Sequence, residues 1–223
     1  MKHTGISKFC VGAVVGAVVV AVVGAALTGV TASELKADPV ADFYKGRQVS
    51  MQVGFGAGGG YDTTARIVAR YLGKHIPGNP TVIVQNVPGA GSMKVANYVF
   101  NAAPKDGTVL AVFSSSVAVQ PLYGNKKAKF ETSRFEWIGS MHTDIQSCGV
   151  WKGAGRGIQT LPDLLASKEP IVFGATSPAS PTSQFPLFLK NILGANIKVI
   201  TGYKGTKGIN LAMQRGEVQG TCG

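Results

Sequence analysis

Short runs of β-branched and apolar residues alternate along this chain with loops of small residues and with helical stretches. The apolar runs predict strands, which we place at residues 49–53, 81–85, 108–113, 171–173 and 198–200. Strands that alternate with helices are typical of an α/β fold. We therefore expect an α/β protein with parallel sheets.

The first helical stretch follows a glycine-rich loop and carries a single apolar stripe. Arg66 and Arg70 lie together on a different face of this helix. The spacing i, i+3, i+4 and i+7 defines the stripe, which consists of Ala65, Val68, Ala69 and Leu72. We expect the stripe to pack on a sheet.

The first 32 residues differ in kind from the rest of the chain. Lys2 and Lys8 flank a polar start, residues 9–27 carry no charge, and small residues precede a cleavage point after Ala32. We interpret this segment, residues 1–32, as a secretory signal peptide. Because its apolar stretch is unusually long, an uncleaved membrane anchor is the alternative. No later stretch is apolar for long enough to span a bilayer, so the exported part is expected to be soluble.

Charge and composition narrow the class of partner. The chain has 223 residues, of which 45% are hydrophobic, which suffices for one large domain or two small ones. Without the two signal lysines, 20 basic residues oppose 11 acidic ones, so the exported chain has a net charge of +9 and an anionic partner is expected. The basic residues are dispersed. The only tight cluster, Lys126, Lys127 and Lys129, is interpreted as a solvated loop, so no nucleic-acid partner is predicted.

Small and polar residues follow four of the predicted strands, at residues 56–62, 86–92, 114–116 and 175–183. In an open α/β sheet such strand exits gather at one edge, where helix N-termini point free N–H groups and positive dipole ends at a ligand. This edge is predicted to hold an anion without needing a lysine.

Gly54, Gly56 and Gly59 match the letters of the dinucleotide fingerprint G-x-G-x-x-G directly after a strand. The second strand, however, ends in Gln85-Asn86 and lacks the acidic residue that would bind a ribose. No Gly-Lys-Ser/Thr follows, which excludes the phosphate loop of nucleotide hydrolases. We interpret the loop as a cradle for a carboxylate, with close packing of strand and helix as the alternative.

Candidate catalytic residues are few. His142, Asp144 and Cys148 lie within seven residues, but in an extended segment positions i and i+6 are about 20 Å apart, too far for a nucleophile and its base. The serines at 114–116 lack the nucleophile-elbow motif, and the histidines lack metal-ligand spacing. No catalytic residue, metal or cofactor is predicted, and an enzyme is the less favoured alternative. Cys148 fits either a buried small apolar residue or a structural disulfide.

Six short motifs follow one another from Phe43 to the end of the chain: F-Y-K-G-R at 43–47, G-G-G-Y-D at 58–62, N-V-P-G-A-G-S at 86–92, P-K-D-G at 104–107, G-Y-K-G at 202–205 and G-E-V at 216–218. In this order they resemble the Bug-type solute-binding proteins of tripartite tricarboxylate transporters. The resemblance implies a monomeric periplasmic receptor that delivers a small di- or tricarboxylate to membrane subunits of the transporter. A periplasmic sensing module that hands the ligand to a signalling partner is the alternative.

The resemblance also implies a type II periplasmic binding protein fold with two α/β lobes. A polar linker at residues 33–42 would precede a first lobe at 43–141 and a second lobe at 142–223. Family members continue beyond the Gly-Glu-Val strand and return to the first lobe, so the 223 residues are expected to be C-terminally truncated. With only one hinge connection, near residues 140–143, such a fragment is expected to aggregate and to bind weakly.

Between the two lobes, the family holds carboxylates through loop amides, hydroxyls and bridging waters. For Asp62 we favour acceptance of amide hydrogen bonds in the first helical turn over direct ligand contact. By position, the implied contacts of the first lobe are Phe55, Ala57, Gly58, Gly59, Gly60, Asp62, Gly89, Ala90, Gly91, Ser92, Ser114, Ser115 and Ser116. Those of the second lobe are Thr176, Ser177, Ser180, Tyr203 and Gly205.

Two further features depend on the resemblance. Ala57 stands where family members usually carry proline, which predicts a more mobile first loop. Of the three cysteines, Cys10 lies in the predicted signal peptide, which leaves Cys148 and Cys222. Because the strands that hold these two are expected to be neighbours in the second lobe of the family fold, a disulfide between them is predicted.

Overall fold

The computed structural model describes residues 37–223, apart from 142, 144 and 154–156. The predicted signal peptide and its cleavage point lie outside the described residues. Pro39–Gly223 forms a compact unit of its own. It begins with helix α2 (Pro39–Tyr44), which overlaps the last four residues of the predicted linker. Proline is well tolerated in the first turn of a helix, where its missing N–H would have no partner in any case.

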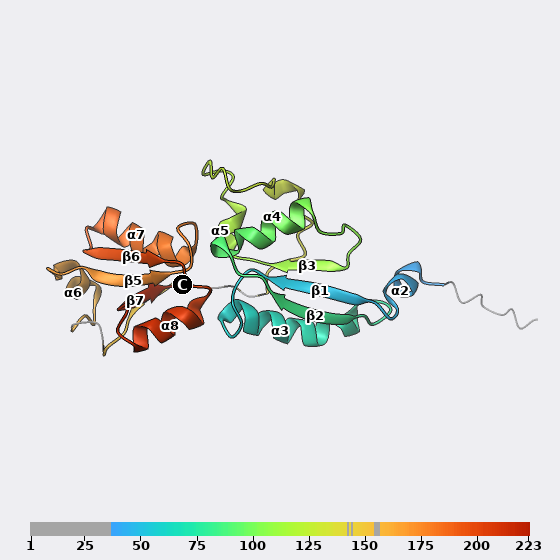
Figure 1. Cartoon of the computed structure of the whole chain (residues 1–223), viewed down its shortest axis with the longest axis horizontal. Coiled ribbons are helices and arrows are strands. Elements are labelled where there is room, and N and C mark those ends of the chain that lie inside the picture. The colour runs from blue at the N-terminus through green and yellow to red at the C-terminus, as the bar shows by residue number, and fades with distance from the viewer. Residues whose placement is uncertain (1–36, 142, 144, 154–156) are drawn as a thin grey trace, which may run out of the picture. The chain divides into compact units, whose positions relative to one another are not determined.

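The first sheet has three parallel strands in the order β2-β1-β3 (Figure 1). They are β1 (Gln48–Val53), β2 (Thr81–Asn86) and β3 (Val109–Val112), and all three were predicted within two residues of their observed ends. Met51 of β1 is paired with Val84 of β2 and with Leu110 of β3. We call this sheet with its helices the first lobe.

Helix α3 (Gly60–Leu72) covers the apolar face of this sheet. Met51, Val53 and Phe55 form a core with Ala65, against which the other members of the predicted stripe pack. The predicted helix and its buried face are therefore confirmed. Helix α4 (Met93–Asn101) lies along β3, and its residues Met93 and Ala96 belong to a separate core with Phe130. The other short elements of this lobe are η1 (Gly73–His75), η2 (Ala90–Ser92), α5 (Ser115–Ala118) and η3 (Thr132–Arg134).

The second sheet has the order β4-β7-β5-β6, and we call it with its helices the second lobe. Its strands are β4 (Cys148–Val150), β5 (Ile171–Ala175), β6 (Ile197–Thr201) and β7 (Gly220–Cys222). Strand β5 is parallel to β6 and β7, but β4 is antiparallel to β7, so the prediction of purely parallel sheets is wrong for this edge. We predicted parallel strands because a helical crossover joins two parallel strands. The chain between β4 and β7 instead runs through two other strands and three helices. An antiparallel edge strand on a parallel sheet is common.

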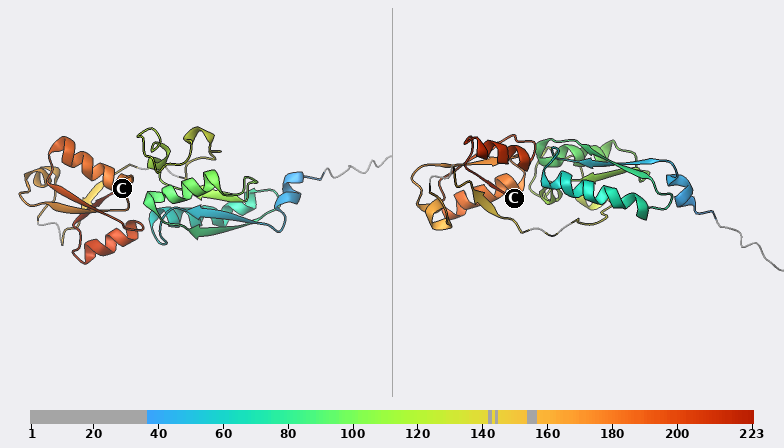
Figure 2. Two further views of the ribbon diagram at one scale, coloured as in Figure 1. Left: turned by 45° about the horizontal axis from the view of Figure 1, so that its top comes forward. Right: turned by 90° about the horizontal axis from the view of Figure 1, so that it is seen from below.

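Both faces of the second sheet are covered by helices. Ile171 and Phe173 of β5 pack in a core that includes Leu189 of α7 (Pro181–Leu193), whereas Val172 packs against the core of α8 (Thr206–Gln214). The alternation follows from the period of two along a strand. Figure 2 shows α7 and α8 beside these strands in two further views. Helix α6 (Leu161–Ala166) contributes Leu164 to the first of these cores.

A disulfide closes the edge of the second sheet. Cys148 and Cys222 are directly paired across β4 and β7, and their sulfur atoms are bonded at 2.01 Å. The Cys222 side chain is 1% exposed and belongs to the core of the lobe. The bridge therefore ties two segments that are 74 residues apart in sequence.

Candidate functional site

A cavity of about 260 Å³ lies where the exits of β1, β3 and β5 meet the first turns of three helices. Among the described residues that line it, none is Lys, Arg, Asp or Glu. Seven of the lining residues are predicted site residues: Phe55, Gly59, Gly60, Ser114, Thr176, Ser180 and Gly205. The cavity therefore offers hydroxyls, amides and aromatic surface.

Three helices begin at this cavity without a side-chain cap. Gly59 precedes α3, Ser180 precedes α7 and Gly205 precedes α8, and none of these residues caps its helix by a side-chain hydrogen bond to a backbone N–H. Each of the three also lines the cavity. Helix N-termini without a side-chain cap present free N–H groups and the positive ends of helix dipoles. Helix α7 contributes mainly its dipole, because Pro181 has no N–H and Ser183 N–H donates to the Ser180 carbonyl oxygen at 3.0 Å. Together the three N-termini create a positive electrostatic environment of the kind that suits an anion, and no described lining residue adds a positively charged side chain.

The fingerprint glycines have a packing role. A Cβ on Gly54 would lie 2.1 Å from Ser92 Cβ, so only glycine allows the loop after β2 to approach β1 this closely. A Cβ on Gly56 would lie 3.3 Å from the carbonyl oxygen of Lys204, which accepts a hydrogen bond from Gly56 N–H at 2.8 Å. At Gly54 the glycine therefore serves close packing of two segments, which was the alternative to a carboxylate cradle.

Gly59 and Gly60 differ from these packed glycines. Gly59 is buried and has φ −88° and ψ 174°, an extended backbone that any residue adopts. Its absent side chain leaves room beside Thr206, whose Oγ1 would be 3.3 Å from a Cβ. A Cβ on Gly60 would meet nothing within 4 Å. These two positions keep the amides at the start of α3 accessible from the cavity.

Hydroxyl groups form a connected network after β5. Thr182 Oγ1 accepts from Thr176 N–H at 3.0 Å and lies 2.7 Å from Ser180 Oγ. Ser180 Oγ also contacts the peptide of Ser177, donating to its carbonyl oxygen at 2.7 Å. Thr176, Ser180 and Thr182 all line the cavity and are at most 9% exposed. Their mutual bonds fix the hydroxyl positions, so little reorganisation is needed when a polar ligand enters.

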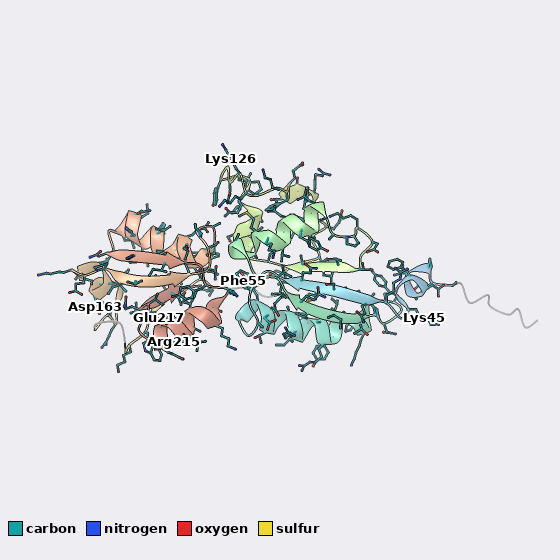
Figure 3. The ribbon with its side chains drawn as sticks, in the orientation of Figure 1. Lys45, Phe55, Lys126, Asp163, Arg215 and Glu217 are labelled. Atoms are coloured by element: carbon teal, nitrogen blue, oxygen red, sulfur yellow. A yellow bond between two sulfur atoms is a disulfide. The ribbon has the colours of Figure 1, made fainter. Side chains whose placement is uncertain are left out.

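Two stacked aromatic rings form an apolar wall of the cavity. The rings of Phe55 and Tyr61 are 4.3 Å apart between centroids and inclined by 15°. Phe55 follows β1, as Figure 3 shows, and Tyr61 lies in the first turn of α3. A wall of this kind suits the carbon skeleton of a small ligand whose polar ends are bound elsewhere.

Asp62 organises the loop before α3 and does not line the cavity. Its carboxylate is 3% exposed, accepts from Gly58 N–H at 2.8 Å and from Asn86 Nδ2 at 2.8 Å, and forms an ion pair with Arg66 at 3.0 Å. Asn86 Nδ2 also donates to the carbonyl oxygen of Phe55 at 3.0 Å. Asp62 therefore accepts a hydrogen bond from a backbone amide, as expected, and its bond from Asn86 links the exits of β1 and β2.

The Asp62 network predicts a specific loss of stability in acid. Burial by itself raises the pKa of Asp62, but hydrogen bonds from Arg66, Gly58 and Asn86 outweigh it and lower the pKa from 3.8 to about 2. Because the folded pKa lies below the unfolded value, the stabilisation is complete above pH 4 and is lost as the pH falls from about 4 to about 2. We expect this contribution to be about 2 kcal/mol. Urea unfolding across this pH range should show this loss in the wild type and not in Asp62→Asn. If the free energy of unfolding changed equally with pH in the two proteins, the role assigned to the network would be contradicted.

The structure places the other predicted contacts outside the lining of this cavity. Gly91 and Ser92 are buried, and Ser92 Oγ accepts from Ser114 N–H at 2.9 Å, which turns the loop after β2 into the interior. Tyr203 packs in the core of α8, and burial raises its pKa. The full set outside the lining is Ala57, Gly58, Asp62, Gly89, Ala90, Gly91, Ser92, Ser115, Ser116, Ser177 and Tyr203.

Seven further residues line the cavity that were not among the predicted ligand contacts: Tyr61, Thr64, Gln146, Pro181, Thr182, Thr206 and Gly223. Tyr61, Pro181 and Thr182 lie within two of the predicted strand exits, at 56–62 and 175–183. Thr206 begins the helix after β6, whose exit was not among the four predicted ones. Gln146 and Gly223 carried no such signal. They are near each other through β-pairing, because Gly223 N–H donates to the Ser147 carbonyl oxygen at 2.9 Å.

Of the three candidate catalytic residues, the structure describes Cys148. His142 and Asp144 lie outside the described residues, and Cys148 is in the disulfide. Within the described parts of the chain, no group of three His, Cys, Asp or Glu side chains could hold a metal ion. In the same residues no helix is both long and apolar enough to cross a membrane.

No protein-family model and no curated protein matches the chain. Solved structures do match it. The periplasmic binding protein BugD has a TM-score of 0.62 at 21% identity, over 80% of this chain and 59% of its own. MatC from Rhodopseudomonas palustris, with bound malate, has a TM-score of 0.67 at 22% identity, over 79% of this chain and 60% of its own. An R. palustris protein with adipate has a TM-score of 0.61 at 20% identity, over 79% of this chain and 58% of its own.

The chain has the periplasmic binding protein fold. Its neighbours include a Bug protein, in agreement with the resemblance that the six motifs carry. The chain spans 59%, 60% and 58% of the lengths of the three solved chains, respectively. Of these three structures, BugD is a periplasmic binding protein, and the two R. palustris proteins contain malate and adipate, respectively.

Proposed function

We propose that this chain is a periplasmic receptor that binds a small organic di- or tricarboxylate in the cavity and delivers it to the membrane subunits of a tripartite tricarboxylate transporter. It performs no chemistry on the ligand and acts as a monomer. The observation that carries the proposal is the meeting of three helix N-termini without side-chain caps at a cavity whose described lining residues carry no charge.

The chemistry of the lining favours a carboxylate over other anions. Free N–H groups and hydroxyls bind carboxylate oxygens by charge-assisted hydrogen bonds, which are about twice as strong as neutral ones. The stacked pair of Phe55 and Tyr61 would cover the carbon chain between two carboxylates. A volume of about 260 Å³ suits a small acid and is less than a dinucleotide needs.

The residues assigned to the ligand are those predicted from the sequence that also line the cavity. In this proposal the amides at Gly59 and Gly60 bind one carboxylate, and the hydroxyl of Thr176 with the backbone N–H of Gly205 binds the other. Ser180 lines the site beside them, and its hydroxyl donates to the Ser177 carbonyl oxygen. Malate and adipate, present in two structures of this fold, are ligands of this class.

Calorimetric titration of the full chain tests the proposal directly. Malate, adipate and succinate are titrated in parallel with inorganic phosphate and AMP, and each mixture is then assayed for chemical change of the ligand. We expect saturable binding of at least one dicarboxylate, no competition by phosphate or AMP, and unaltered ligand. Turnover of the acid, or displacement of it by phosphate or AMP, would contradict the proposal.

A further inference from the structure

We propose that residues 121–129, which we call the basic tip, form a contact site for a bilayer that contains anionic phospholipid. The tip presents two adjacent apolar side chains, Leu122 and Tyr123, which are 82% and 70% exposed. Lys126, Lys127 and Lys129 follow directly and are exposed. This inference does not depend on the carboxylate ligand.

The apolar part of the tip is held in place by its own hydrogen bonds. Tyr123 N–H donates to the Val119 carbonyl oxygen at 3.2 Å, and Asn125 N–H donates to that of Gln120 at 3.2 Å. The side chains of Asn125 and Gln120 are also bonded, at 2.8 Å, and Gln120 is only 3% exposed. A buried base therefore supports a defined turn that holds two large apolar groups in water.

The basic part is anchored separately, to helix α4. Asn97 Nδ2 donates to the Lys127 carbonyl oxygen at 3.0 Å, and Asn97 Oδ1 accepts from Lys129 N–H at 2.7 Å. Asn101 Nδ2 donates to the Lys129 carbonyl oxygen at 2.7 Å. These bonds fix the backbone and leave the lysine side chains directed outward, as Figure 3 shows for Lys126.

The three ammonium groups lack acidic partners in the described residues: the ion pairs found there join Arg66 with Asp62, Arg134 with Glu131, and Arg215 with Glu217. Three unpaired positive charges beside an apolar turn raise the local electrostatic potential. Such a surface attracts an anionic one and loses that attraction as salt screens it.

The shape of the tip favours a bilayer over a protein partner. A stable protein interface buries about 800 Å² on each side, around a central pocket-filling group. The tip instead offers two neighbouring side chains with lysines beside them. Tyrosine and leucine insert readily at a membrane interface, where lysines pair with anionic headgroups.

A local fluorescence readout tests this in the full chain, whose residues 9–27 are themselves apolar and could adsorb to lipid. An environment-sensitive fluorescent amino acid replaces Tyr123, and the chain is titrated with phosphatidylcholine vesicles with or without phosphatidylglycerol. We expect a response to the anionic vesicles that weakens in high salt. The triple change Lys126→Gln, Lys127→Gln and Lys129→Gln should weaken it roughly 100-fold, from about fivefold for each lysine.

Two matched controls separate the tip from general adsorption. The same label at Tyr71, which is 54% exposed on α3, should not respond. The triple change Lys168→Gln, Lys190→Gln and Lys198→Gln removes equal charge from the second lobe and should leave the response at position 123 intact. An equal response to neutral vesicles, an equal response at position 71, or an unaltered response in the tip triple variant would overturn the proposal. A response to a soluble acidic peptide without any response to vesicles would identify a protein-docking surface instead, and would overturn it as well.

Discussion

Gly59→Val is expected to weaken dicarboxylate binding about 100-fold, which corresponds to about 2.7 kcal/mol. The valine side chain would occupy the space in front of the first amides of α3 and would prevent the charge-assisted hydrogen bonds that we assign to them. Gly59 has an extended backbone, so the substitution adds no backbone strain. Its Cβ would lie 3.3 Å from Thr206 Oγ1, a contact that a small shift of the hydroxyl relieves. The fold should therefore persist.

Calorimetry with the dicarboxylate that binds the wild type measures this effect, and urea unfolding checks that the fold is intact. Gly149→Val is the matched control, because Gly149 lies in edge strand β4 and a Cβ there would meet nothing within 4 Å. The control should retain wild-type affinity. Unchanged affinity in a folded Gly59→Val protein would exclude this loop from the binding site.

Reduction of the Cys148–Cys222 disulfide is expected to lower the free energy of unfolding by about 4 kcal/mol. The bridge spans 74 residues, and closure of a loop of that length removes about this much conformational entropy from the unfolded chain. For a domain of this size the change corresponds to a fall in Tm of about 10 °C. Thermal unfolding of the oxidised and reduced wild type measures it without any substitution.

The double variant Cys148→Ala and Cys222→Ala serves as the control for the disulfide. It should unfold near the temperature of the reduced wild type and should not respond to reductant. A wild-type protein whose Tm is insensitive to reductant, or two titratable thiols at positions 148 and 222 in unfolded, unreduced protein, would contradict the bridge.

The sequence by itself was sufficient to predict the strands of the first sheet and helix α3. In these segments the pattern has a local cause, because a buried strand must be apolar and a helix that packs on it must carry an apolar stripe at helical spacing. Met51, Val53 and Ala65 meet for that reason. The rule that exits of parallel strands gather at one edge also accounts for Gly59 and Ser114 at one cavity. Thr176 follows β5 of the other sheet, so its position at the same cavity does not follow from the rule.

The rule that strand exits gather at a ligand site wrongly placed the loop after β2 at the cavity. Ala90, Gly91 and Ser92 all have positive φ, and this backbone turns the loop inward, where Ser92 packs against Gly54. Residue types along the loop resemble those of a ligand cradle, because glycine and serine suit both a close approach to a ligand and a close approach to another segment. Only the tertiary structure distinguishes the two uses.

The structure alone also decided the direction of β4 and the contribution of Gln146 and Gly223 to the cavity. Strand β4 has three residues, too few for a periodic pattern, and its partner β7 lies far away in the sequence. Local pattern carries no information about which distant strands pair, since pairing depends on the cores that both strands complete. The sequence therefore determined the elements and the chemical character of their ends, whereas long-range packing decided which of those ends meet at the cavity.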